Sequence, residues 1–598
     1  MSKPSAARSR NRQRAGLALD DRSVWAVTTP SVVREDNGAP SAAEPKRSAL
    51  QRLRGFWLGE ADLAPLGLFR IVYGILLFNW VWQLLPNLSP FFTDEGMLPR
   101  SSLLTFFPVR FSLLNVVGEW WQVWLFWLAS LAVAVMLTVG YRTRTACVLA
   151  FLIIVSFQWR NPLILDGSDL VFRLVAFWMI FTAAGDRYSV DAALRRVRGD
   201  APSGFGPALP VRILELQIAW IYLTTCIDKL AGTKWLDGTA TYYALQLKHT
   251  FGRAWIEPLA RNPFFNRLVT WGTLVVELAF LPLVFSPALT RHARLVAVIT
   301  IAMLHIGIIL MMNVGNFPVI MLAALILFLP PDLVSRMVDA GRRLLPRSRV
   351  RFYYDGACHF CQRTAAFLAA LDIYKTITFV DIRTIGPSEA SFGRIRLAKR
   401  IHVVDEQGQI TSGFAAVARA GRAIPLLAPL AVLVRVPGLA WIADRVTGWL
   451  ARRWLLVLSC PGGDCERHSP VAPPVKHPPI ARLRWQRPAI HALVAVVALA
   501  AFASAVPQTL AAYRTPEPFN RFLVLGSLDQ RWNMFAPDPM IADGWLLGPG
   551  RLADGTAIDV ITEGPASEEP RFADPLYSRW AKVTERIANP AYIQYRLE

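Results

Sequence analysis

Two cysteines three residues apart are the strongest chemical signal in this chain. Cys358 and Cys361 form a Cys-x-x-Cys motif that follows the apolar run 350–354 and a glycine-containing turn, and it precedes a helix-like segment at 362–371. Unpaired N–H groups and the positive end of the dipole at a helix start stabilise a thiolate. Cys358 would then attack as the nucleophile. Cys361 would resolve the mixed disulfide, because two cysteines on one helical turn can reach each other.

A second cysteine pair leaves other chemistry open. Cys460 and Cys465 could relay electrons to or from the first pair, but four thiolates could also close a tetrahedral zinc site, and the thiols could be unreactive. The redox interpretation is favoured because the first pair opens an apolar helix, whereas zinc knuckles usually come from loop turns. We therefore predict no metal site, and we take Asp355 and His359 as candidate modulators of proton transfer.

The run Y-D-G-x-C-x-x-C that begins at Tyr354, followed by an Ala- and Leu-rich helix, resembles the DCC family of thiol-disulfide oxidoreductases. The resemblance covers about 349–468 and includes a strand at 377–381, a hairpin at 401–412 and a helical tail through Trp454. It implies a small α/β thioredoxin-like domain. It also implies disulfide exchange with a thiol or disulfide partner protein.

The whole chain is too apolar for one soluble domain. Its 598 residues are 54% hydrophobic and include 21 tryptophans. We predict a polytopic α-helical membrane protein with about eight spans and a later ninth, because nine apolar windows approach the roughly 20 residues that cross a bilayer. The third window could equally be a buried core helix. The windows are 66–86, 120–140, 145–160, 168–185, 211–231, 268–287, 294–312, 316–331 and 489–507.

The chain has a net charge of +21, and its basic residues are distributed as in a membrane protein. If the N-terminus is cytoplasmic, the main basic turns fall inside after an even number of crossings, as the positive-inside bias requires. We therefore expect the lipid bilayer as partner and no nucleic acid, in the inner or plasma membrane, with the Cys-x-x-Cys domain cytoplasmic and the C-terminal tail extracytoplasmic. The basic turns are Arg142/Arg144, Arg187–Arg198, Arg291/Arg294 and Arg336–Arg351.

These patterns divide the chain into six segments. The N-terminal arm is polar and basic without an apolar period, so we expect it to be disordered. The tail shows a hairpin signal, with short apolar runs flanking Ala553-Asp554-Gly555. The segments are a basic arm at 1–59, a multi-span domain at 60–332, the thioredoxin-like domain at 349–468, a Pro-rich linker at 469–488, one more transmembrane helix at 489–507 and a β-rich tail at 508–598.

Ionisable groups inside the apolar windows are costly and are therefore candidates for function. Lys229 ends a window, where desolvation would let it act as a base, although it could also snorkel to the interface. The alternative for each group is internal pairing, for example of Arg173 with Glu215 or Glu277. The candidate membrane-site residues are Arg70, Arg173, Asp228, Lys229, Glu277 and His305.

The Lys-Leu-x-x-x-Trp run that begins at Lys229, with Arg70, Glu277 and His305 in order, resembles the HTTM domain, the membrane region shared with vitamin K-dependent γ-carboxylase. The resemblance covers about 60–332. It implies that Lys229 is the base that deprotonates a hydroquinone. The chain departs from the carboxylase at Leu165-Asp166-Gly167-Ser168-Asp169, where a functional histidine is missing.

We therefore predict a membrane-bound thiol-disulfide oxidoreductase, an enzyme with no certain cofactor and a quinone-like lipid as the candidate ligand. The alternatives are a carboxylase-like lyase or oxygenase or a quinone-binding protein with a regulatory Cys-x-x-Cys domain, and a non-enzymatic scaffold. One further run, Trp532 to Pro539, looks like the segment after the last span in bacterial HTTM-type proteins. We expect it to pack on the membrane domain.

Overall fold

The computed structural model divides the chain into two compact units, Met1–Arg52 and Leu53–Glu598. In the first unit the Ser48 hydroxyl accepts the Gln51 N–H at 3.2 Å, and the Gln51 side chain accepts the Ser48 N–H at 3.0 Å. This reciprocal cap begins a helix where we expected disorder; the rest of the predicted arm, 1–47, lies outside the described residues. The structure describes residues 48–106, 109–197, 202–247, 251, 253–287, 289–344, 350–354, 356, 359–372, 376–382, 401–424, 427, 445, 486–506, 516–541, 548–559, 564–565, 579–580, 582–583 and 586.

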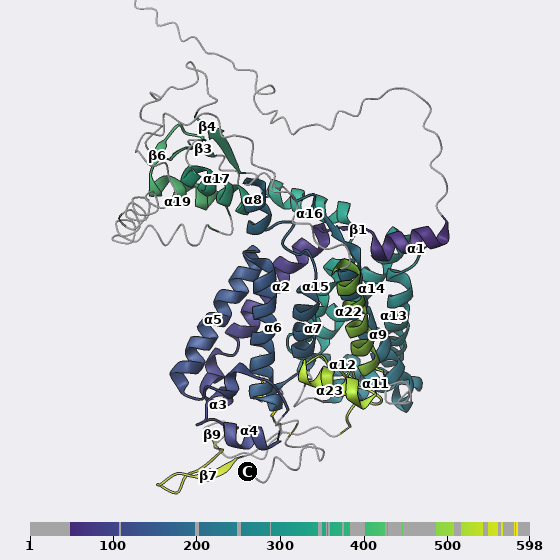
Figure 1. Cartoon of the computed structure of the whole chain (residues 1–598). Helices are drawn as coiled ribbons and strands as arrows, with labels where there is room; N and C mark the ends of the chain where they lie inside the picture. Colours follow the sequence, from purple (N-terminus) through teal and green to yellow (C-terminus); the bar gives the residue numbers. More distant parts are fainter. Residues whose placement is uncertain are drawn as a thin grey trace, which may run out of the picture. The chain divides into compact units, whose positions relative to one another are not determined.

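The described residues of the second unit are mainly helical (Figure 1) and also form three small sheets. Its larger helices are α2 (Ala64–Trp82), α5 (Trp120–Val139), α6 (Thr143–Arg160), α7 (Gly167–Met179), α9 (Ala208–Leu230), α13 (Pro263–Val284), α14 (Thr290–Met311), α15 (Phe317–Ala324), α16 (Pro331–Leu344) and α22 (Gln486–Ser504). The shorter helices are α1 (Ala49–Leu58), α3 (Leu88–Phe92), α4 (Arg100–Phe106), α8 (Val190–Val197), α10 (Thr233–Leu236), α11 (Ala240–Gln246), α12 (Glu257–Ala260), α17 (His359–Leu371), α19 (Phe414–Ala423) and α23 (Glu517–Leu525).

Every predicted apolar window contains a helix, but fewer helices than predicted meet the requirements for a span. Among the described residues, four are long and apolar enough to cross a membrane, or five if a bent pair counts as one span. That pair, Phe317–Phe328 and Pro331–Gly341, is bent by 112°, so the predicted window 316–331 is not one straight helix. The helices in four other windows, α6, α7, α9 and α22, do not qualify as spans; α7, for example, has only 13 residues.

The helices of the membrane domain share one apolar core. Helix α2 packs on α5, and α13 packs on α9 and α14. Trp80 and Trp178 are among its largest fully buried side chains. The later helix α22 joins this core through Phe502, whose carbonyl accepts the Trp220 indole N–H at 3.2 Å. Outward-facing apolar side chains on α5, α13 and α14 are exposed, as expected for helices that contact lipid.

The segment after the bundle forms a four-stranded sheet in the order β4-β3-β5-β6. Strands β3 (Val350–Tyr354) and β4 (Ile377–Asp381) are parallel and are joined through α17, whereas β5 (His402–Val404) and β6 (Ile410–Ser412) form an antiparallel hairpin beside β3. Gly408 turns this hairpin with φ +76°, a conformation that favours glycine. The strands and hairpin predicted here are confirmed, and the predicted helical tail lies largely outside the described residues.

The described residues of the C-terminal part include one small sheet. Strands β7 (Pro549–Arg551), β8 (Ala557–Asp559) and β9 (Gly564–Pro565) form a small antiparallel sheet, and Gly555 turns the predicted hairpin with φ +89°. The residues expected to form its first strand, 544–547, lie outside the described residues. Two short strands, β1 (Glu60–Asp62) and β2 (Phe205–Pro207), pair where the chain enters α2 and α9.

Candidate functional site

The frame around the cysteine motif agrees with the sequence prediction. Helix α17 begins at His359, one residue after Cys358, so Cys361 lies in its first turn and is partly exposed. This helix follows β3 and precedes the parallel strand β4, as expected for a βαβ unit. Cys358, Asp355, Cys460 and Cys465 lie outside the described residues, as does the side chain of His359, and their predicted roles stay predictions.

The turn before Cys358 is held from two sides at Gly356. Its N–H donates to the Asp381 carboxylate at 2.9 Å, and its carbonyl accepts a hydrogen bond from the Gln362 side chain. A side chain at Gly356 would collide with the Asp381 carboxylate, so the Asp381 side chain would have to move to admit one. Burial and the negative charge of Asp381 raise the pKa of the neighbouring Tyr354. The sequence analysis missed Asp381, although a carboxylate at the carboxyl end of β4 was a usable signal.

Helix α17 also contacts the membrane domain. Val190 of α8 is buried in the same apolar cluster as Ala365 and Leu368 of α17, and Val139 at the end of α5 packs against it. Helix α8 follows the C-terminus of α7 in the chain. The thiol domain therefore contacts the membrane domain at the end where α7 stops.

A buried ion pair joins two helices of the membrane domain. The Lys229 ammonium lies 2.6 Å from Glu277 Oε1, and the two residues are 5% and 6% exposed. They come from the end of α9 and the middle of α13. Two opposite charges in an apolar core remain charged only if they stay paired, because either alone is poorly solvated. The indole ring of Trp235 covers the ammonium at 4.6 Å.

A second polar pair lies two helical turns along α9. The Tyr222 hydroxyl is 2.8 Å from His305 Nε2 on α14, and seven residues of helix separate Tyr222 from Lys229 by about 10 Å. Within the described part of the chain, Glu277 Oε2 and His305 Nδ1 are buried without a hydrogen-bond partner. Both pairs therefore keep unused bonding capacity in a core where such groups are costly.

The structure does not place Arg70 and Arg173 in this group. The fully buried Arg70 donates to the carbonyls of Ala184 and Tyr188 at 3.1 and 2.5 Å, which fixes the segment before α8. Arg173 donates to the Gln158 side chain at 3.1 Å and to the Asp529 carbonyl at 3.0 Å.

The pairing suggested for Arg173 is wrong, because the two carboxylates have other partners. Glu215 pairs with Arg212 at 2.7 Å and with Arg294 at 3.1 Å, whereas Glu277 pairs with Lys229. Asp228 is half-buried beside Lys229.

The segment that lacks the carboxylase histidine begins α7 instead. Asp166 accepts the N–H groups of Ser168 and Asp169, and Asp169 accepts the Asp166 N–H, so the two aspartates form a capping box. The carboxylate of Asp169 is 1% exposed and holds Arg579 through two hydrogen bonds of 2.9 Å. Sequence reasoning missed this contact, because nothing local in the chain links residues 410 positions apart.

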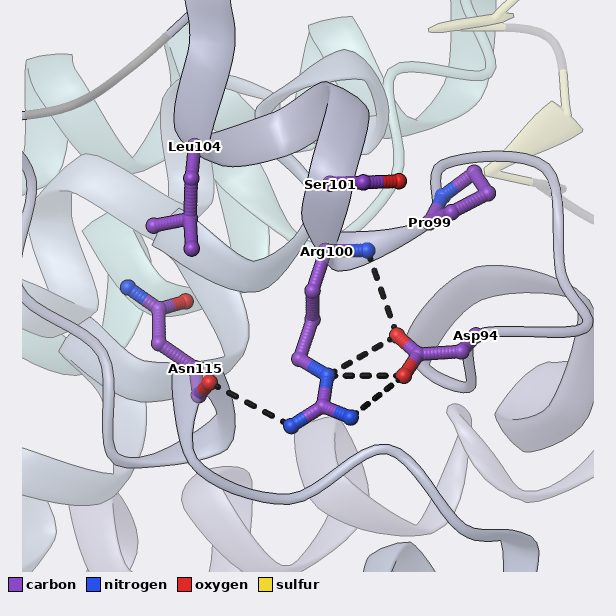
Figure 2. A pocket seen from close by; sticks show the side chains of 6 residues that line it. All are labelled: Asp94, Pro99, Arg100, Ser101, Leu104 and Asn115. Atoms are coloured by element: carbon purple, nitrogen blue, oxygen red, sulfur yellow. Dashed lines mark hydrogen bonds and ion pairs between the residues drawn. The ribbon is translucent and has the colours of Figure 1, made fainter.

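An open cavity of about 520 Å³ lies near the start of α4, away from every predicted site residue. Figure 2 shows that Arg100 extends across it between Asp94 and Asn115. The hydrogen bond from Arg100 lowers the pKa of the Asp94 carboxyl. Arg100 is thus engaged by its neighbours, and we assign this cavity no ligand. Its lining residues are Asp94, Pro99, Arg100, Ser101, Leu104 and Asn115.

Comparisons with known proteins match both parts of the second unit. Residues 352–457 match the family model of the DCC1-like thiol-disulfide oxidoreductase, and residues 59–333 match the HTTM domain. No solved structure matches.

Two curated relatives come from Bacillus subtilis (strain 168). The chain is 29% identical over 226 residues to the uncharacterized protein YitO, a match that spans 37% of this chain and 72% of YitO. It is 24% identical over 201 residues to the sporulation-delaying protein SdpB, spanning 33% of this chain and 61% of SdpB. The two family matches together place an HTTM domain at 59–333 and a DCC1-like thiol-disulfide oxidoreductase domain at 352–457 of the same chain.

Proposed function

We propose that this protein is a membrane-bound thiol-disulfide oxidoreductase that uses Cys358 and Cys361. The observation that supports this most directly is the start of α17 at His359, immediately after Cys358. The positive end of the dipole of this 13-residue helix favours a thiolate at its start. The parallel βαβ unit with its added hairpin is consistent with a small thioredoxin-like domain.

The proposed exchange has two steps. The Cys358 thiolate attacks a disulfide of a partner protein, a mixed disulfide forms, and one partner sulfur leaves as a thiolate. Cys361, as a thiolate, then attacks the Cys358 sulfur, the mixed disulfide breaks, and the second partner sulfur leaves. The partner gains two electrons and the chain keeps a Cys358–Cys361 disulfide; the reverse sequence oxidises a partner. Asp355 and His359 would modulate the proton transfers, and Cys460 and Cys465 would relay electrons.

Charge placement supports a cytoplasmic thiol domain. Two contacts each bring two of the basic turns together. Asp191 of α8 accepts the N–H groups of Arg142 and Thr143, which joins the turn at 142–144 to the basic segment 187–198. Arg291 pairs with Asp332 of α16 at 2.9 Å, which joins the turn at 291–294 to the helix that leads into the basic segment 336–351. Helix α16 also packs on α2. Basic residues favour the cytoplasmic side of a membrane, where cysteines are kept reduced.

Single substitutions in the full-length protein test this function. In nanodiscs, Cys358→Ser should abolish reduction of a model disulfide substrate, Cys361→Ser should accumulate the mixed disulfide, and Lys229→Ala should retain exchange. A Cys358→Ser protein that exchanges disulfides at the wild-type rate would contradict the proposal.

A second candidate function is binding of a quinone-like lipid at the buried pairs. The observation that favours it is the unused bonding capacity of Glu277 Oε2 and His305 Nδ1 within the described core. A hydroquinone hydroxyl could donate to Glu277 Oε2, and a quinone carbonyl could accept from His305 Nδ1 when that nitrogen carries the proton. Lys229 would act as the base, as in the carboxylase-type lyase or oxygenase, only after its ammonium has given up a proton. If Lys229→Ala abolishes activity while Cys358→Ser keeps it, this candidate is favoured; a scaffold role is favoured if neither variant changes the phenotype.

A further inference from the structure

A short C-terminal segment is attached to the turn that follows Lys229. We call residues 532–538 the closing segment. Its Phe535 carbonyl accepts the Trp235 indole N–H at 2.8 Å. Its Asp538 carboxylate accepts the Lys234 N–H at 2.8 Å and the Thr233 hydroxyl at 3.3 Å. All three donors belong to α10, so the closing segment is fixed where α9 ends.

Only one layer of side chains separates the closing segment from the buried ion pair. Trp235 contacts the closing segment through its N–H, while its ring lies 4.6 Å from the Lys229 ammonium. Phe535 packs on the cluster formed by Cys226, Trp235, Ala240 and Leu274. Its ring also meets Phe251, with the ring centres 5.7 Å apart. Removing the closing segment would therefore expose the covering of the ion pair to water.

Two backbone features show that this attachment is specific. Phe535 has φ +54°, a left-handed conformation that side chains rarely adopt and that persists only when surrounding contacts hold it. The Pro537 carbonyl occupies the space where Gly232 would carry a side chain. Gly232 itself has φ −92°, which any residue adopts. Glycine is thus required by the closeness of the closing segment and not by its own backbone.

We propose that the closing segment is a detachable cover that controls access of water and polar molecules to the Lys229–Glu277 pair. Residues just before it provide a fixed anchor, because Gln530 exchanges hydrogen bonds with Gln217 and Asp529 pairs with Arg110 at 2.8 Å. Opening would break the contacts of residues 535–538 with α10 and relieve the strain at Phe535, while this anchor and Trp532, which is buried in the main core, stay in place. The inference does not depend on the thiol chemistry.

Native cysteines make the cover testable. Cys226 is 0% exposed beneath Trp235 and Phe535, whereas Cys147 is 1% exposed in the main core of the membrane domain. Each can be kept as the single thiol after the other five cysteines are replaced by serine or alanine. A water-soluble maleimide applied to the full chain in nanodiscs then reports access to either position.

Gly232→Ala should displace the closing segment, because the added methyl group collides with the Pro537 carbonyl. We expect labelling of Cys226 to rise by at least about tenfold, the factor that corresponds to a modest change in an opening equilibrium. Cys147 should stay unlabelled. Gly272→Ala is the matched control, since nothing lies within 4 Å of its added methyl group, and it should label as wild type.

Asp538→Ala gives a second and milder test, because it removes two hydrogen bonds without adding an atom. It should also raise labelling of Cys226. If Gly232→Ala makes Cys147 reactive too, that variant has unfolded and the Asp538→Ala result decides. Cys226 that stays as protected as in the wild type in Asp538→Ala, or in a folded Gly232→Ala protein, overturns the proposal.

Discussion

The thiol domain and the buried Lys229–Glu277 pair position their candidate reactive groups by different means. Around Cys358 the frame is local: a strand, a glycine turn and a helix follow one another within about 20 residues of sequence. Lys229 and Glu277 lie on two helices and are 48 positions apart in the sequence, yet their side chains are 2.6 Å apart. The closing segment, which covers them, comes from beyond residue 530. The local surroundings of Cys358 can be predicted from a sequence motif. The long-range surroundings of Lys229 and Glu277 become visible only in the three-dimensional fold.

The largest expected effect of a substitution on stability is at the buried pair. Glu277→Leu leaves the Lys229 ammonium buried and unpaired, which should lower the free energy of unfolding by about 3–5 kcal/mol. Lys229→Met in the same chain should restore most of it, because both charges are then gone. Thermal unfolding in detergent, measured for the two single variants and the double variant, gives the coupling energy. Additive losses would show that the two side chains do not pair.

Gly356 offers the corresponding test in the thiol domain. Gly356→Ala should collide with the Asp381 carboxylate and displace the turn before Cys358, at a cost of about 1–3 kcal/mol. Disulfide exchange should slow, while the membrane domain stays folded. Adding Asp381→Ala removes the colliding group. If the double variant is no better than Gly356→Ala, Asp381 does not shape this turn.

The contact between the two regions is tested at Val190. Val190→Ala removes two buried methyl groups from the cluster shared by α8 and α17, which should weaken it by about 1.5 kcal/mol. Hydrogen exchange should then increase in α17 and β3 but not in α13. The half-buried Leu194, on the same helix, should give a smaller increase when it is replaced by alanine. Unchanged exchange in α17 would show that this contact does not stabilise the thiol domain.

The smallest expected effect is the pH dependence at the anchor of the C-terminal segment. Burial acts to raise the pKa of Asp529, but the hydrogen bonds from Arg110 and the charge of Arg173 outweigh it, so the pKa is lowered. A carboxyl whose folded pKa is lowered stabilises the fold above its unfolded value, about 3.9, and loses that contribution as the pH falls through the folded value. The thermal unfolding midpoint should therefore fall as the pH is lowered below about 4. Asp529→Asn should make this fall smaller. An equal drop in both proteins would assign it to other carboxyls.

The sequence was sufficient where neighbours in the chain decide the structure. Val350–Tyr354, Ile377–Asp381 and the hairpin around Gly408 form the expected strands, and the helix starts beside Cys358, because short apolar runs and glycine turns specify these elements locally. Lys229, Glu277 and His305 were selected only because charged or polar groups in apolar helices are rare.

The partners of these groups could not be predicted from one chain. Arg173 carries a charge that fits several carboxylates, and only packing shows that it binds Gln158 and the Asp529 carbonyl. The role of the closing segment was missed for the same reason. Its aromatic and proline residues indicate a turn but do not show which part of the fold that turn covers. The bend after Phe328 also escaped prediction, because the apolar window gave no sign of it.

The central claim is that Cys358 and Cys361 form a redox-active dithiol. The most direct test is the reduction potential and reactive-thiol pKa of the full-length protein, with Cys147 and Cys226 replaced by alanine and the metal content measured on the same sample. The account predicts a reversible Cys358–Cys361 disulfide and a thiolate pKa well below the ordinary value of about 8.5. Metal-loaded thiols, or thiols with an ordinary pKa that form no reversible disulfide, would contradict it and move the search for chemistry to Lys229.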